Sequence, residues 1–143
     1  MTDVDSKALV RRYYEEVFNQ RNPDLIDQLA TDDYVEHYPF PGHGNGRSDL
    51  KARVRLILDA MNPLRFSVED VVAEGDRVVV RWTQTATQTG SFLGMPPTGR
   101  TATFSGIDIH ALRGGRMAEH WHVVDMYALL QQLGAIPAPS GAA

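Results

Sequence analysis

Up to Pro63, apolar positions recur with the spacing of amphipathic helices. In residues 6–20 an apolar side chain returns every three or four positions with charged residues between, which predicts a helix with one buried side. Asn22-Pro23 ends this helix, and Pro23 suits the first turn of a short second one. We expect a third helix from Ser48, as its N-cap, to Asn62-Pro63, which stops it.

Between the second and third helices, residues 31–46 are rich in Asp, Pro and Gly, which predicts a brief extended segment followed by a loop. Beyond Pro63 the period changes to 2, which predicts strands over residues 66–73, 77–87 and 101–112. Residues 88–100 carry Gly and Pro and cannot be a central strand.

The segment 114–134 carries two histidines and a tryptophan on one further strand. Alternation places His120 and His122 on one face and Glu119, Trp121 and Val123 on the other. Gly114-Gly115 lets this strand pair with residues 101–112 as a hairpin. A three-residue loop, 113–115, puts His110 on the face of the two histidines, whereas a two-residue loop pairs it with Glu119 and Trp121.

Asp125 can cap a final helix over residues 126–133, which Gly134 ends, and we expect residues 137–143 to fray. Three helices, then an antiparallel sheet of about four long strands and a short C-terminal helix define an α+β fold of one domain, residues 1–143. Such a sheet must curl around the helices to cover its apolar face. Curling leaves a cone whose mouth can admit a ligand.

Composition narrows the class of partner. The net charge is −4 and Lys and Arg form no block, so neither nucleic acid nor an anionic membrane is an expected partner. With no cysteine, disulfides and thiolate sites are excluded, which fits the cytoplasm. The N-terminus has acidic residues where a signal peptide has basic ones. We therefore expect a soluble cytoplasmic protein that binds a small molecule.

Several segments together resemble one family. They are VRRYYEEVFNQ, YVEH, VEDVVAEGDRVVVRWTQTATQTG, GSFLGMPPTGRTATFSGIDIH, GGRMAEHWHVVD and LLQQLG. In these segments the chain resembles the SnoaL-like polyketide cyclases, or ester cyclases, within the NTF2-like cone-shaped α+β barrels. The resemblance covers nearly the whole chain. The resemblance indicates the fold and the superfamily more than a particular reaction, because one scaffold hosts many chemistries.

The resemblance implies a chemistry of secondary metabolism. The best known members of the family close the last ring of anthracycline precursors by intramolecular aldol condensation, without a cofactor. For these members the resemblance implies a buried acid/base aspartate on the last strand and a histidine on the strand before it. His110 matches that histidine, His122 falls on the position of the catalytic aspartate, and Asp125 matches a second acidic residue nearer the helix.

From this match we expect cofactor-free ring closure of an apolar, carbonyl-bearing, polyketide-like molecule. His122 would be the general base, His110 would donate to the enolate oxygen, and Asp125 would orient His122 or only cap the helix. The candidate substrate-binding residues are Tyr14, His37, Trp82, His120 and Trp121, of which the two tryptophans also suit the core.

Three alternatives remain open from the sequence. The three histidines could ligate a metal, although no acidic ligand is fixed by spacing, and we expect none. The same fold could instead open an epoxide or hydroxylate its substrate. A non-catalytic binding module is the third, in which Glu119, Trp121 and Val123 would serve a sheet-to-sheet contact. We expect a homodimer in each case.

Overall fold

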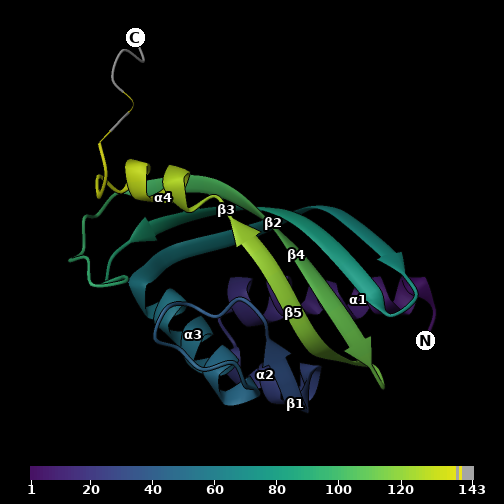
Figure 1. Cartoon of the computed structure of the whole chain (residues 1–143). Coiled ribbons are helices and arrows are strands. Elements are labelled where there is room, and N and C mark those ends of the chain that lie inside the picture. Colours follow the sequence, from purple (N-terminus) through teal and green to yellow (C-terminus); the bar gives the residue numbers. More distant parts are fainter. Residues whose placement is uncertain (138, 140–143) are drawn as a thin grey trace.

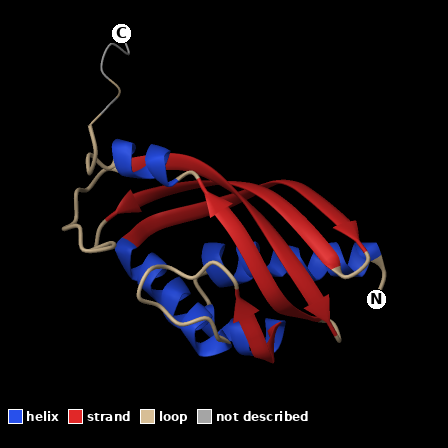
Figure 2. Ribbon diagram, viewed as in Figure 1, coloured by secondary structure: helices blue, strands red, loops and turns tan. Residues whose placement is uncertain are grey.

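The computed structural model describes residues 1–137 and 139, so most of the tail predicted to fray lies outside the described residues. A curved sheet arches over the N-terminal helices, and α4 lies against β4 at one end of it (Figures 1 and 2). The elements in order are α1 Asp3–Arg12, η1 Tyr13–Asn19, η2 Pro23–Leu25, α2 Ile26–Leu29, β1 Ala30–Glu36, α3 Arg47–Ala60, β2 Met61–Glu74, β3 Arg77–Gln88, β4 Thr101–Arg113, β5 Arg116–Val124 and α4 Met126–Gln132.

The sheet has five strands in the order β1-β5-β4-β3-β2, one more than the sequence predicts. Four pair antiparallel as expected, while β1 pairs parallel with β5. The extra strand is the brief extended segment of the prediction. Its Asp32-Asp33 pair interrupts the apolar alternation, so only pairing with β5 reveals it as a sheet strand. The α+β class is confirmed.

The first helix is wound in two ways. After α1 the backbone continues as the π-helical segment η1, with i→i−5 hydrogen bonds such as Gln20 N to Glu15 O (2.9 Å). The wider turn buries both Tyr13 and Tyr14, whereas an α-helical reading expects one inward ring of the two. This local distortion therefore supplies two tyrosines to the interior instead of one.

Two predicted boundaries are wrong. Helix α3 begins at Arg47 with Gly46 as its N-cap, and the Asp49 carboxylate accepts the Gly46 N–H at 3.0 Å, so Ser48 lies inside the helix. Asn62-Pro63 does not end that helix but lies within β2, which starts at Met61. Pro63 is tolerated because β2 is an edge strand.

The β4–β5 hairpin combines the two registers that the sequence left open. Its turn has two residues, Gly114-Gly115, both with positive φ, and Arg113 pairs with Arg116. A bulge at Ala118 then shifts the register by one, so that His110 pairs with His120 after all. Met117 and Ala118 are both buried, which breaks the predicted alternation at this point.

Along β4 the usual polarity of a sheet is reversed. Asp108 and His110 point inward and are buried, while Ile107 and Ile109 point outward and are exposed. A strand that buries its ionisable residues and exposes its isoleucines loses apolar burial, so this inversion marks the interior as a site. No helix within the described residues is long and apolar enough to cross a membrane.

Candidate active site

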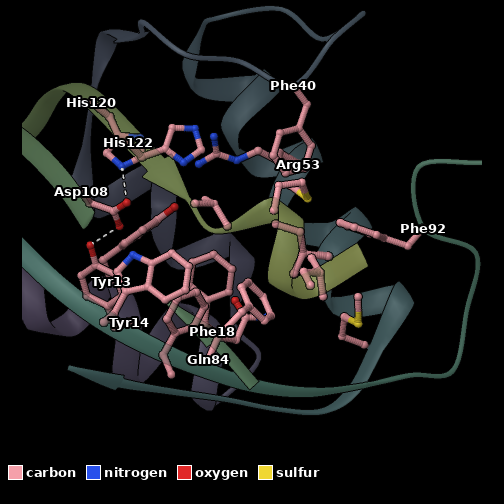
Figure 3. Close-up of a pocket in the computed structure, with 18 residues that line it drawn as sticks. Tyr13, Tyr14, Phe18, Phe40, Arg53, Gln84, Phe92, Asp108, His120 and His122 are labelled. Atoms are coloured by element: carbon pink, nitrogen blue, oxygen red, sulfur yellow. Dashed lines mark hydrogen bonds and ion pairs between the residues drawn. The ribbon is translucent and has the colours of Figure 1, made fainter. Parts of the chain in front are cut away.

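A cavity of about 70 Å³ lies between the concave face of the sheet and the N-terminal helices (Figure 3). Most of its wall is aromatic or aliphatic, and the charged and histidine side chains lie together at one end. The lining residues are Tyr13, Tyr14, Phe18, Phe40, Arg53, Ile57, Met61, Phe66, Trp82, Gln84, Phe92, Phe104, Asp108, His120, His122, Val124, Met126 and Leu129.

The lining residues that keep partial exposure locate the mouth. They are Phe40, Ile57, His122, Val124 and Met126. The mouth therefore lies between α3, the loop after β1, and the junction of β5 with α4. The remaining lining residues are buried and form the inner wall.

Tyr14 joins two ionisable residues of β4 in the inner wall. Its hydroxyl donates to Asp108 Oδ2 at 2.5 Å, and its oxygen lies 2.8 Å from His110 Nε2. Because the hydroxyl hydrogen goes to the carboxylate, His110 must donate through Nε2–H, which leaves the lone pair on Nδ1. Burial lowers the pKa of His110 to about 3, with the nearby His120 adding to the effect, so this ring is neutral.

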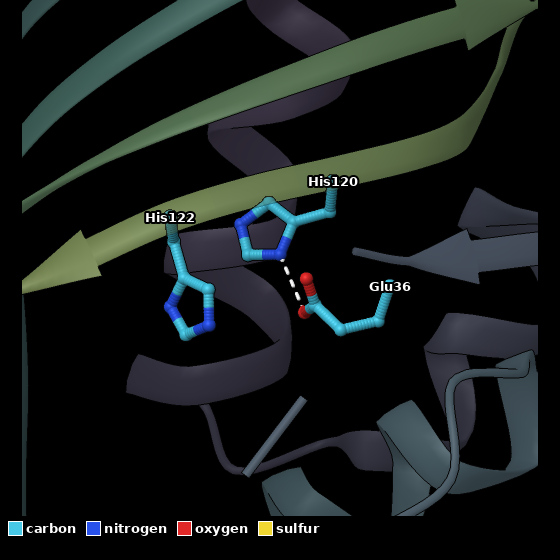
Figure 4. Close-up of side chains that lie close together, drawn as sticks. All are labelled: Glu36, His120 and His122. Atoms are coloured by element: carbon cyan, nitrogen blue, oxygen red, sulfur yellow. Dashed lines mark hydrogen bonds and ion pairs between the residues drawn. The ribbon is translucent and has the colours of Figure 1, made fainter. Parts of the chain in front are cut away.

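His120 is held between two carboxylates. Its Nδ1–H donates to Glu36 Oε1 at 2.7 Å, and its Nε2 lies 3.5 Å from Asp108 Oδ1 without hydrogen-bond geometry (Figure 4 draws the Glu36 bond). Burial works against the charged form, but the Asp108 and Glu36 carboxylates outweigh it and raise the pKa of His120. The two carboxylates therefore favour the imidazolium form of His120, whose Nε2 lies on the side of Asp108.

Arg53 of α3 completes the charge balance. Its Nη1 donates to the same Glu36 Oε1 at 2.6 Å, and both side chains are buried. Burial opposes ionisation of Glu36, yet His120 and Arg53 together lower its pKa to about 2. Two buried anions, Asp108 and Glu36, thus face two buried cations, which is the arrangement that a low-dielectric interior requires.

His122 differs from His120 although the two rings stack 4.9 Å apart. Its Nε2 lies 2.8 Å from the Tyr38 main-chain oxygen. A carbonyl only accepts, so Nε2 carries the hydrogen and Nδ1 carries the lone pair. Burial, then the positive charges of His120 and Arg53, lower the pKa of His122. A neutral histidine with a free lone pair therefore stands beside a protonated one.

The structure brings only part of the predicted site together. Tyr14, Trp82, His120 and His122 line the cavity. His110 lies one layer behind it, bonded to Tyr14. Trp82 is buried in the core, and its indole forms part of the cavity wall.

Three predicted residues lie outside the cavity. Asp125 is exposed and caps α4, its carboxylate accepting Ala128 N–H at 3.0 Å. His37 stacks on Trp121 with ring centroids 4.4 Å apart and bonds Glu119 at 2.9 Å on the other face of the sheet. Trp121 turns outward because alternation from inward His120 and His122 requires it.

Sequence reasoning missed Asp108, Glu36, Arg53 and Gln84. Asp108 had a readable signal, because it lies two residues before His110 on one strand and therefore shares its face. Glu36 and Arg53 had none, since their partners lie 84 and 17 residues away and are set by the β1–β5 pairing and by the docking of α3.

Two groups of residues have the composition of a metal site. Glu36, His120 and His122 place ligand atoms within 4.8 Å of one another, and so do Asp108, His110 and His120. Neighbouring rings in each group stack with an interplanar angle of 30°, and His120 Nδ1 is already hydrogen-bonded to Glu36.

Comparison with known proteins agrees with this fold. The family model of the SnoaL-like polyketide cyclases matches residues 8–133. The chain belongs to the SnoaL-like polyketide cyclase family. No protein of curated description matches it significantly.

Three solved structures from Streptomyces species are similar over nearly their whole length. TsrD from Streptomyces laurentii is 29% identical with a TM-score of 0.87, over 95% of this chain and 99% of that chain. AclR from Streptomyces galilaeus, described as a putative hydroxylase, is 28% identical with a TM-score of 0.86, over 98% and 87%. IdmH from Streptomyces antibioticus, described as a putative polyketide cyclase, is 28% identical with a TM-score of 0.77, over 90% and 98%.

Proposed function

We propose that this protein closes a ring in a carbonyl-bearing, polyketide-like molecule by acid/base catalysis. One observation carries the proposal: neutral His122 and protonated His120 stack side by side on the wall of a mostly apolar cavity. A base and an acid with opposite pKa shifts in one site are what enolate chemistry requires.

In the first step the Nδ1 lone pair of His122 takes a proton from the carbon next to the substrate carbonyl. The C–H electron pair moves into a new C=C bond, and the carbonyl π pair moves onto oxygen. His120 Nε2–H donates to that enolate oxygen and stabilises its charge. Asp108 and Glu36 keep His120 protonated for this purpose.

In the second step the enolate carbon attacks a second carbonyl carbon of the same molecule. The C=C pair of the enolate forms the new C–C bond while a lone pair of the enolate oxygen re-forms the first C=O bond. The π pair of the second carbonyl moves onto its oxygen, which takes the proton from His122. His122 returns to its neutral state and no electrons are lost or gained. The reaction is therefore balanced with this chain's own residues.

The proposal revises the roles expected from the sequence. The donor role passes from His110 to His120, because His110 gives its hydrogen to Tyr14. The buried carboxylate is Asp108 on β4, the Cα partner of His122, in place of an aspartate on the last strand. Asp125 has no part in it, because its carboxylate caps α4.

The size of the cavity bears on the substrate. A volume of about 70 Å³ is well below the roughly 300–1,000 Å³ of common ligand pockets. The cavity is therefore smaller than such a substrate, whose entry requires Phe40 and its loop to move outward at the mouth. The many aromatic side chains of the wall favour a planar, apolar body.

Solvent deuterium exchange tests the chemistry. In D₂O the wild type should exchange the methyl hydrogens of an aromatic methyl ketone, and His122→Asn should lower the rate by about 10²–10⁴-fold, the usual contribution of a general base. His37→Gln, on the outer face, is the control and should exchange at the wild-type rate. Equal exchange by His122→Asn and wild type would assign the base to another residue.

A second candidate is an epoxide-opening or hydroxylating enzyme, which the similarity to AclR, a putative hydroxylase, favours. In the epoxide reaction Asp108 would take a proton from water, the water oxygen would attack an epoxide carbon, and His120 would protonate the leaving oxygen. This reaction forms no enolate. Turnover of an epoxide without deuterium exchange into ketones would support it over ring closure.

We also propose that a second copy of the chain covers the outer face of the sheet. A shallow groove there is lined by Tyr38, Arg77, Ile107, Ile109, Trp121, His122 and Val123. Its exposed isoleucines and valine form an apolar surface, and a two-fold axis would let the same surface cover itself.

A further inference from the structure

Two glutamines are buried on the concave face of β3, and the protein treats them differently. Gln88 is fully buried and all its polar atoms are used: its amide donates to the main-chain oxygens of Gly90 and Pro96 at 3.2 and 3.1 Å, and its oxygen accepts from Thr98 at 2.8 Å. Gln88 therefore holds the 89–100 loop and is structural.

Gln84 lies four residues earlier on the same face and is 5% exposed. It lines the cavity, with Phe66 of β2 and Phe104 of β4 as its Cα partners on either side (Figure 3 labels Gln84). Among residues 1–137 and 139, none forms a hydrogen bond with its side-chain amide. The only face left to this amide is the cavity.

The Gln84 amide is not among the fully buried polar groups without a partner, so it keeps contact with the cavity space. An amide between aromatic rings with no protein partner is costly there. A leucine or methionine would fill the same place at lower cost. We propose that the Gln84 amide binds an oxygen substituent of the substrate at the end opposite the reacting carbonyl. The inference rests on the proposed function for the position of that carbonyl, beside His120 and His122.

The register of the sheet sets the separation of the two polar points. Gln84 pairs with Phe104, and His122 pairs with Asp108, four residues further along β4. At about 3.4 Å per residue the two rows lie roughly 14 Å apart along the strand. The substrate is thus a planar aromatic ketone with a hydroxyl or a second carbonyl at its far end.

A matched pair of ligands tests this assignment. 2-Acetylnaphthalene and 6-hydroxy-2-acetylnaphthalene differ only in a hydroxyl at the end away from the ketone. By isothermal titration calorimetry the wild type should bind the hydroxyl compound about tenfold more tightly, the usual worth of one net hydrogen bond. Gln84→Met, which keeps the volume and removes the amide, should bind both with equal affinity.

Thermal unfolding gives a readout that a structural role would not produce. Gln84→Met should keep or raise the Tm, because no described residue hydrogen-bonds the amide that it removes, whereas Gln88→Met should lower it by freeing the 89–100 loop. Gln84→Leu is the second variant in case methionine does not fold.

The outcomes separate this inference from the proposed function. Deuterium exchange at the acetyl methyl of either compound by the wild type reports on the base, and the ratio of the two affinities reports on Gln84. A preference without exchange would keep Gln84 as the recognition residue and reject the base. Equal wild-type affinities, a preference retained by Gln84→Met, or binding of neither compound would overturn the inference.

Discussion

At the scale of single residues, the interior is a balanced set of charges. Asp108 and Glu36 are anions, His120 and Arg53 are cations, and His110 is neutral because burial holds its pKa near 3. Each buried group keeps its protonation state only while its neighbours keep theirs. The cluster therefore links the chemistry of the cavity to the stability of the fold.

The stability of the protein should depend on pH in a defined way. The folded pKa of His110 is depressed from 6.5 to about 3, so its contribution to the unfolding free energy is lost as pH falls from about 6.5 towards 3. Glu36, depressed from 4.5 to about 2, adds a loss below about 4.5. His120 has a raised pKa, so its contribution is full below 6.5 and is lost at higher pH.

Urea unfolding between pH 4 and pH 8 measures this dependence. The unfolding free energy should be largest near pH 6.5, where the losses on the two sides meet. His110→Asn removes the buried imidazole and should flatten the decline between about pH 6.5 and 4.5. An unchanged decline in this variant would mean that His110 is not the group responsible.

At the scale of elements, the sequence predicts those helices and strands whose apolar residues recur with a clear period. The helix of residues 6–20 and strands β3 and β4 appear where the apolar spacing puts them. What the spacing does not encode is the π-helical segment after Arg12, the bulge at Ala118 and the strand β1. Each depends on contacts with another element.

The contact of β3 with β4 at Gly106 is one such dependence. A Cβ at Gly106 would lie 2.2 Å from Trp82 Cζ2, so Gly106→Ala must push the indole towards the cavity. We expect a loss of about 1–3 kcal/mol in unfolding free energy, the usual cost of overpacking. Trp82→Leu makes room, so the alanine should cost much less in the double mutant. Additive losses in chemical denaturation would contradict this account.

At the scale of the whole molecule, the two faces of the sheet differ in character. The concave face holds the ionisable cluster. The convex face carries a row of apolar side chains, exposed or partly exposed, that pair across β2 to β5: Val72, Val79, Ile109 and Trp121. His122 borders both the cavity and the outer groove. Covering the convex face would therefore also shield the entrance side of His122 from water.

The proposed homodimer can be broken from this face. Val123 is 69% exposed in the groove, and Val123→Glu should convert a dimer to a monomer because the carboxylate would be buried against its copy. Val4 on α1, 75% exposed, is the matched control, and Val4→Glu should remain a dimer. Light scattering after gel filtration gives the mass. A monomeric wild type would reject the dimer.

The sequence by itself determined the α+β class, the order of most elements and the family, because these follow from periods and motifs that are local to the chain. It also placed His120 and His122 on one face, since alternation is a local rule. Only the tertiary structure decided that His110 shares this face, because a bulge in β5 shifts the register. It also decided that Asp108 and Glu36 raise the pKa of His120 while the pKa of His122 is lowered. The pKa of a buried group depends on what packs around it, and those neighbours come from strands and helices far apart in the sequence.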